Sequence, residues 1–253
     1  MHELAEYFRR REFTESALDR YLEFAKPRDW DIEGQDGKLQ LYEWASQAFD
    51  PSDPEKFRQV YDVVRNWRGA QRAGGGSWAR AEKVFDAILE KGGEFLYGGQ
   101  VSLTNLKVGS LEAGGLGGFL PHLRFVKKNK HYPWMPVSKV LHFANPGLFP
   151  IWDRKVMWET VMTRAFHTDY KTFCGKHGFA GWEDSAQFNV NYTLWAAHCI
   201  QQSDGDFMEW FREWMESKFA DDLAGLRIRQ RLQTFYATAF EFVAIGAACL
   251  EQP

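Results

Sequence analysis

The chain has 253 residues and a formal net charge of −3, with 45% hydrophobic and 26% charged residues. This length can bury a full hydrophobic core, and the composition is ordinary for a soluble globular protein. No apolar run is long enough to span a bilayer, and residues 1–13 lack the apolar stretch of a signal peptide. Three widely spaced cysteines indicate a reducing compartment without disulfides: Cys174, Cys199 and Cys249. We therefore expect a cytoplasmic protein that does not contact a membrane.

The hydrophobic periodicity predicts a mainly α-helical chain, with at most one small strand element near residues 101–106. Thr14 is expected to cap a first helix that runs to residue 26 and buries Leu18 and Tyr21. Proline and glycine breaks separate the next expected helices, at 39–49, 54–67, 78–91 and 118–129.

The second half continues the helical pattern, with helices expected at 153–166, 185–202 and 206–218 and a loop at 171–184. The first of these helices should bury one face made of Val156, Met157, Thr160 and Val161. An aromatic stripe on the third is expected to be core rather than a ligand site: Phe207, Trp210, Phe211 and Trp214. Residues 221–250 are typical of a long helix, with a break expected at Gly225 or Gly246.

Positive charge is concentrated in residues 121–176. This window holds ten lysines and arginines and three acids, a net charge of +7, so the rest of the chain carries −10. A local basic patch on an acidic protein is typical of a protein that docks an anionic partner in one place. A solvated charged face gives the same pattern, so charge alone does not decide between the two.

Several chemistries are excluded by their missing motifs. The glycines at 74–76 are not followed by the Gly-Lys-Ser/Thr of a phosphate loop, and no dinucleotide fingerprint or nucleophilic-serine elbow is found. Three cysteines cannot supply the four thiolates of an iron–sulfur cluster. One Cys-x-x-His pair at 174–177 and an adjacent His-Cys pair at 198–199 fit a structural zinc site poorly. We expect no metal and no cofactor.

One stretch, residues 136–156, combines helix signals with a tight turn. It predicts a short helix, a loop interrupted by Pro146, Gly147 and Pro150, and the start of a second helix. Lys139 lies in the first helix and Asp153 opens the second. Because the loop brings the chain back, we expect a lysine and a carboxylate to face one cleft.

The residues in this stretch follow a known order. Val137-Ser-Lys139-Val is followed by Leu141-His-Phe143 and then by Leu148-Phe-Pro-Ile-Trp-Asp153-Arg-Lys-Val156. This order resembles the helix-hairpin-helix superfamily of DNA glycosylases, in which a lysine often starts the second hairpin helix and the aspartate of Phe-Pro-x-x-Asp-x-x-Val opens the next helix. The resemblance covers residues 118–156. The family hairpin is usually Leu-Pro-Gly-Val-Gly, whereas this chain has Tyr132-Pro-Trp-Met-Pro-Val137, which indicates a divergent member.

The resemblance implies a two-lobed helical bundle with a cleft between the lobes, formed by a single unit of residues 1–253. Residues 77–166 would form the hairpin and active-site lobe, and 1–76 with 167–253 the second lobe. It also implies base excision: hydrolysis of the N-glycosidic bond of a flipped-out modified or damaged base in double-stranded DNA, without a cofactor and without an obligate protein partner. Asp153 would stabilise the oxocarbenium-like sugar or activate water. Lys139 would be a nucleophile with lyase activity or a substrate contact.

Other residues near the motif would bind the substrate. The flipped base would meet Trp134, His142 and Trp152. The DNA would be contacted by Lys127, Lys128, Lys130, Ser138, Arg154 and Lys155. The departures from the family hairpin suggest a bulky modified base, as in defence against modified phage DNA.

Each of these assignments has a plainer alternative. Asp153 could be only a helix cap, Lys139 a solvated lysine, and His142 and Trp152 core residues. Two other functions stay open for the whole chain. One is a non-catalytic DNA-binding module on the same fold, and the other is a helical protein-interaction domain.

Overall fold

The computed structural model describes residues 2–25, 39, 42–43, 55, 90, 95, 101–108, 116, 120, 134–179 and 188–251, and the structural statements below concern these residues. They are predominantly helical and contain no strand, which confirms the mainly α class. Nearly all of the helices expected between 39 and 129 lie outside the described residues. The same holds for three residues predicted to bind DNA, Lys127, Lys128 and Lys130.

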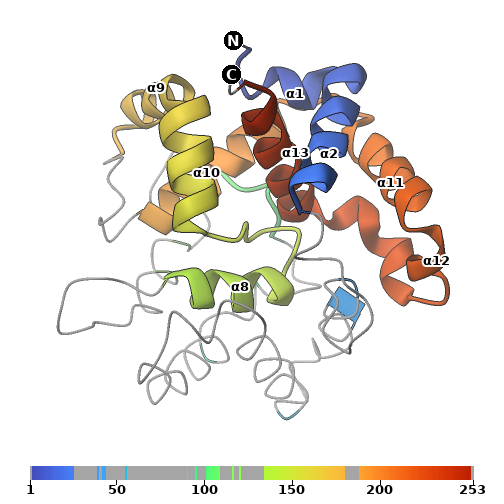
Figure 1. Cartoon of the computed structure of the whole chain (residues 1–253). Helices are drawn as coiled ribbons and strands as arrows, with labels where there is room; N and C mark the ends of the chain where they lie inside the picture. The colour runs from blue at the N-terminus through green and yellow to red at the C-terminus, as the bar shows by residue number, and fades with distance from the viewer. Residues whose placement is uncertain are drawn as a thin grey trace.

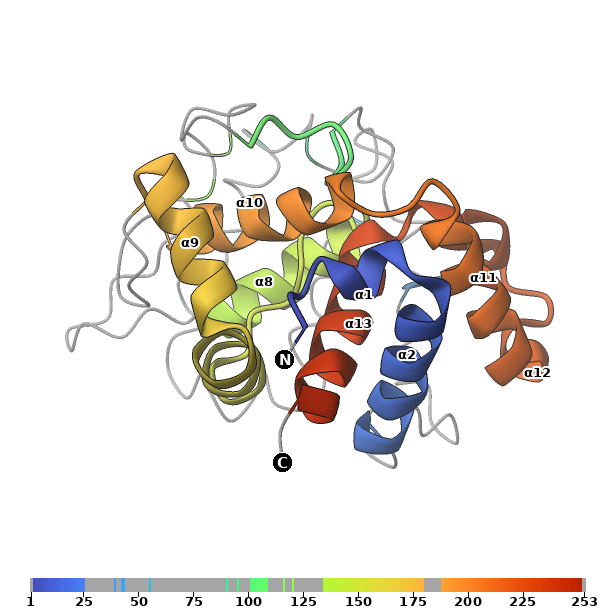
Figure 2. The ribbon, with the colours of Figure 1, turned by 90° about the horizontal axis from the view of Figure 1, so that it is seen from above.

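The described core is built around helix α13, Tyr236–Glu251, which is buried at every residue from 237 to 248. A helix that is apolar on all sides is stable only inside a protein, so the other helices pack around it. Helix α2, Arg11–Ala25, runs alongside it, and both views show the two helices side by side (Figures 1 and 2). Gly246 allows the close crossing, because a Cβ there would lie 1.8 Å from the Ala17 carbonyl oxygen.

The N-terminal helix begins earlier than the sequence predicted. Thr14 was expected to cap it, but α2 already begins at Arg11, directly after the short helix α1, Glu6–Arg9. Thr14 is buried within α2, where its hydroxyl donates to the carbonyls of Tyr7 (2.7 Å) and Arg10 (3.2 Å). The hydroxyl therefore bonds backward to carbonyls instead of accepting an amide hydrogen bond as a cap would. The predicted burial of Leu18 and Tyr21 is confirmed.

The predicted loop at 171–184 is wrong in its first part. Helix α9, His167–His177, continues through it until Gly178, whose φ of 69° provides the left-handed residue that commonly ends a helix. Helix α10, Phe188–Gln201, packs against α9 and α13. Helix α11, Phe207–Lys218, agrees with the prediction, and the core includes three residues of its aromatic stripe: Phe207, Phe211 and Trp214.

The long C-terminal segment is broken at Gly225, one of the two predicted positions. Helix α12, Ala220–Leu223, ends before it, and the 3₁₀-helix η6, Arg227–Thr234, begins after it. Gly225 has a φ of 79°, which is unfavourable for residues with a side chain. In the described part of the chain no single helix is long and apolar enough to cross a membrane. By length and composition alone, η6 and α13 taken together would be long and apolar enough, and a bend of 71° separates them.

Candidate functional site

The predicted helix–loop–helix around residues 136–156 is confirmed. Helix α8, Trp134–Ala144, leads into a loop, and the π-helix η5, Arg154–Ala165, follows it. Asn145 organises the turn: its Oδ1 accepts from the Gly147 amide (3.0 Å), and its Nδ2 donates to the carbonyls of Phe95 (3.0 Å) and Val101 (3.2 Å). The amide side chain thus fixes the start of the loop to two other segments of the chain.

The middle of the loop packs against the N-terminus of α13. The Pro146 carbonyl accepts hydrogen bonds from the amides of Ala237 (2.9 Å) and Thr238 (3.3 Å), which the first turn of a helix leaves without an internal partner. Gly147 lies so near η6 that a Cβ would be 2.6 Å from the Thr234 carbonyl oxygen. Glycine is therefore required here for space.

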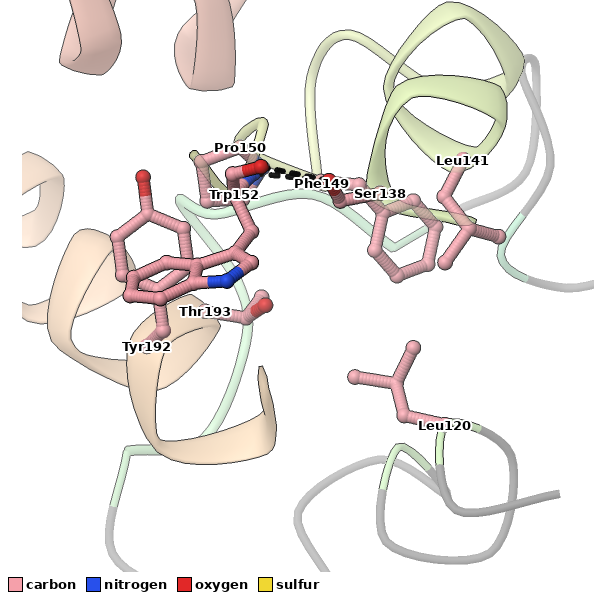
Figure 3. A pocket seen from close by; sticks show the side chains of 8 residues that line it. All are labelled: Leu120, Ser138, Leu141, Phe149, Pro150, Trp152, Tyr192 and Thr193. Carbon is pink, nitrogen blue, oxygen red and sulfur yellow. Dashed lines mark hydrogen bonds between the residues drawn. The ribbon is translucent and has the colours of Figure 1, made fainter. Parts of the chain in front are cut away.

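The last two loop residues before Asp153 are held by side chains of three helices. The Glu241 carboxylate, on α13, accepts the Ile151 amide hydrogen, and the Tyr192 hydroxyl, on α10, donates to the Ile151 carbonyl at 3.2 Å. Ser138 Oγ, on α8, accepts from the Trp152 amide at 2.9 Å and lies 3.4 Å from the Trp152 carbonyl (Figure 3). Ser138 is 5% exposed, so a contact with DNA would need this part of the loop to open.

His142, predicted to meet the substrate base, is completely buried. Its Nδ1 lies 2.7 Å from the Phe149 carbonyl and 3.1 Å from a Glu241 oxygen, and its Nε2 lies 2.6 Å from the Tyr42 hydroxyl. Because a carbonyl oxygen can only accept, Nδ1 carries a proton. The Tyr42 hydroxyl is also 3.0 Å from the Thr238 hydroxyl. The ring therefore takes part in a buried hydrogen-bond network, as the core alternative for this histidine anticipated.

Asp153 is the N-cap of η5, as predicted, with φ −132° and ψ 123°. Its Oδ1 accepts from the Val156 amide at 2.9 Å. The side chain is partly exposed, and its Oδ2 has no hydrogen-bond partner among the described residues. The positive end of the helix faces this carboxylate and stabilises its negative charge. One oxygen is thus fixed by the helix, and the other makes no hydrogen bond within the described part of the chain.

The helix after Asp153 is wound more widely than an α-helix. The Asp153 carbonyl accepts from both the Met157 amide (2.8 Å) and the Trp158 amide (3.2 Å), five residues on. Such π-type winding is rare in proteins, and where it occurs it is often found at functional sites. The π-type winding also changes which residues of η5 are buried, because the predicted buried face assumed α-helical spacing. Val156 and Thr160 are only partly buried, and the face consists instead of Met157, Val161, Met162 and Ala165.

The basic residues of the site lie on both sides of the loop. Lys139 is half-buried on α8. Arg154 and Lys155 are exposed on the first turn of η5, and the Arg154 Nε is 3.8 Å from a Glu159 oxygen. Trp134 is the first residue of α8, and its side chain lies outside the described residues. Two exposed cations therefore follow Asp153 directly at the start of η5.

A small cavity lies beside Trp152. Its volume is about 10 Å³, and it is lined mainly by apolar side chains, among them Phe149, Trp152 and Tyr192 (Figure 3). This volume suits one water molecule and is far below that of a ligand pocket. Trp152 is 5% exposed, and its ring packs edge-on against Tyr192 with 5.7 Å between the ring centres. The cavity does not admit a nucleobase in this conformation.

Two site residues were missed by the sequence analysis. Glu241 is the only charged residue from 236 to 250, and an acid inside an apolar helix is the signal that could have identified it. Tyr192 carries no comparable signal. Burial raises the pKa of the Tyr192 hydroxyl well above its ordinary value, and the nearby carboxylates of Glu241 and Asp153 add to the shift. Tyr192 is therefore a neutral hydrogen-bond donor at physiological pH.

The chemistry at the start of η5 comes from the Asp153 carboxylate and the two exposed cations that follow it, Arg154 and Lys155. No cluster of three or more His, Cys, Asp or Glu residues suited to a metal ion occurs in the described ranges. No protein-family model matches the chain, and no match to it was found among curated proteins or solved structures.

Proposed function

We propose that this protein is a cytoplasmic DNA glycosylase that removes a modified or damaged base from double-stranded DNA. The observation that carries the proposal is the state of Asp153. One carboxylate oxygen caps η5, and the other has no hydrogen-bond partner among the described residues on a partly exposed side chain. The same residue can therefore cap a helix and act on a substrate.

The chemistry fits such a carboxylate. Hydrolysis of an N-glycosidic bond passes through an oxocarbenium-like sugar. A fixed carboxylate can stabilise the positive charge of this sugar, or it can deprotonate the water that attacks it. Lys139 is the proposed nucleophile or substrate contact on the preceding helix. Arg154 and Lys155 are exposed beside Asp153 and are the proposed phosphate contacts. The two-lobed glycosylase fold with its cleft, and a bulky modified base of phage DNA as substrate, belong to this proposal.

An Asp153→Asn variant tests the proposal. Asparagine keeps an oxygen for the Val156 amide and removes the charge, so the variant should fold normally and lose base release by about 10²-fold or more. Both proteins would be incubated with a panel of modified duplexes and hypermodified phage genomes, then treated with hot alkali to cut abasic sites. Asp206→Asn is the matched control, because Asp206 also precedes a helix, is exposed and makes no side-chain cap bond. Equal cutting by wild type and Asp153→Asn would refute the assignment of Asp153.

The small cavity favours a second candidate, a non-catalytic DNA-binding module. A space of about 10 Å³ beside Trp152 leaves no room for a flipped base unless the site opens. This module would bind DNA with an affinity that falls steeply with salt and would release no base. A protein-interaction domain would show no salt-dependent DNA affinity. Binding titrations at two salt concentrations, run beside the release assay, separate the three functions.

A further inference from the structure

We propose that Glu241 and Tyr192 are positioning residues, which fix Asp153 by holding both backbone polar groups of Ile151. The proposal rests on the proposed function, since it concerns the same carboxylate. Neither residue is expected to touch the substrate, because Glu241 is 4% exposed and Tyr192 is 1% exposed. They act on Asp153 through the chain that leads to it.

Side chains take the place of regular secondary structure in this segment. The Ile151 amide is bound by Glu241 and its carbonyl by Tyr192, while Ser138 is within hydrogen-bonding reach of both polar groups of Trp152. Ile151 is itself buried, and within the described residues its amide and carbonyl bind only Glu241 and Tyr192. The segment is therefore fixed from α8, α10 and α13 at once, up to the residue before Asp153.

A buried carboxylate is a costly way to bind one amide hydrogen. Burial of an acid is tolerated when polar groups surround it: Glu241 accepts the Ile151 amide hydrogen, and the His142 Nδ1, which bonds the Phe149 carbonyl, lies 3.1 Å from a Glu241 oxygen. The carboxylate thus has a specific task at the loop.

The proposed role of this contact is to hold Asp153 in a precise position. Catalytic groups must be held within about 0.5 Å of the productive geometry, and a misplacement of about 1 Å can cost 10²-fold in rate. A loop residue two positions away from Asp153 sets the direction in which η5 begins. Release of either end of the Ile151 peptide would let Asp153 move while the rest of the core stays packed.

Tyr192→Phe and Glu241→Ala each remove one of the two bonds to Ile151, and Glu241→Gln restores an acceptor without the charge. Matched controls come from the far end of α13, where the Tyr7 hydroxyl donates to Glu251 (2.7 Å), which also accepts the His2 amide (3.1 Å). Tyr7→Phe and Glu251→Ala therefore remove the same kinds of bond away from the loop. Three quantities are measured: single-turnover base release at saturating DNA, the Kd for that DNA, and amide hydrogen exchange at residues 151–153.

Tyr192→Phe and Glu241→Ala should slow single-turnover release by about tenfold or more, leave the DNA Kd within about twofold, and accelerate amide exchange at 151–153. In Glu241→Gln the amides of residues 151–153 should exchange at nearly the wild-type rate. The control variants should match wild type in all three measurements. Rate losses no larger than those of the controls, or unchanged exchange in Tyr192→Phe, would overturn the proposal. Tyr192→Phe removes one oxygen atom and carries the test if Glu241→Ala fails to fold.

Failure of the proposed function gives a different result. If wild type releases no base from any DNA in the panel, the glycosylase assignment falls, and amide exchange alone decides the positioning. Faster exchange at 151–153 in Tyr192→Phe than in Tyr7→Phe would then support the hold on Asp153, and equal exchange would refute it.

Discussion

Replacing Gly246 by alanine tests the packing on which the core depends. In an exposed helix interior this change is favourable by about 1 kcal/mol, because glycine has the greater conformational freedom when unfolded. Here the new Cβ would lie 1.8 Å from the Ala17 carbonyl oxygen and 2.6 Å from its carbonyl carbon. Both are backbone atoms of α2, so no side-chain rotation relieves the clash.

The cost follows from the separation that the clash requires. Ordinary van der Waals contact begins near 3.4 Å, so α2 and α13 must move apart locally by about 1.6 Å. Overpacking of this kind costs about 1–3 kcal/mol and occasionally more, and a backbone clash belongs at the upper end. After the gain in helix propensity, we expect a loss of about 2 kcal/mol and a Tm lower by about 4–8 °C.

Urea and thermal unfolding of Gly246→Ala measure this loss. Gly175→Ala is the matched control, because Gly175 also lies inside a helix, α9, and a Cβ there would meet nothing within 4 Å. The control should be as stable as wild type or slightly more stable. If Gly246→Ala were as stable as Gly175→Ala, the close crossing of α2 and α13 would be refuted.

Two further predictions concern the helix cap and the pH dependence of stability. Asp153→Ala should lower the unfolding free energy by about 1 kcal/mol through loss of the cap, while Asp153→Asn stays near wild type. Equal stability of the two variants in urea would contradict the cap. Burial, and then the charges of His177, Lys176 and Arg9, lower the pKa of His198 below its ordinary 6.5, so the unfolded state binds the proton more readily. Stability should therefore fall as the pH drops below 6.5, and the plot of Tm against pH should be flatter for His198→Gln than for wild type. An unchanged slope in this variant would disprove the role of His198.

The local features of the site could be predicted from the sequence because their causes are local. Pro146, Gly147 and Pro150 interrupt a helical pattern, and Asp153 stands directly before the next helical segment, where aspartate is a favoured N-cap residue. The aromatic stripe of α11 was equally clear, because its spacing alone places it on one face. These signals need only a few neighbouring residues.

The rest depends on contacts between distant parts of the chain. Glu241 reaches Ile151 across 90 residues and Tyr192 reaches it across 41, and neither pairing leaves a mark in the spacing of residues. The same limit applies to His142, since a buried ring and a pocket ring have the same sequence pattern. Thr14 was misjudged for the same reason: whether its hydroxyl accepts as a cap or donates backward is decided by where the helix begins.

The dependence of the loop on α13 also sets the order in which the protein acquires its site. On the ribosome, residues 145–153 emerge well before Ala237, Thr238 and Glu241, the three residues of α13 that bind the loop backbone. A nascent chain that has reached η5 therefore contains Asp153 but lacks the helix that holds it in place. Contacts of such long sequence separation form late in folding. Until the C-terminal helix has docked, an incomplete chain therefore lacks the contacts that fix the loop before Asp153.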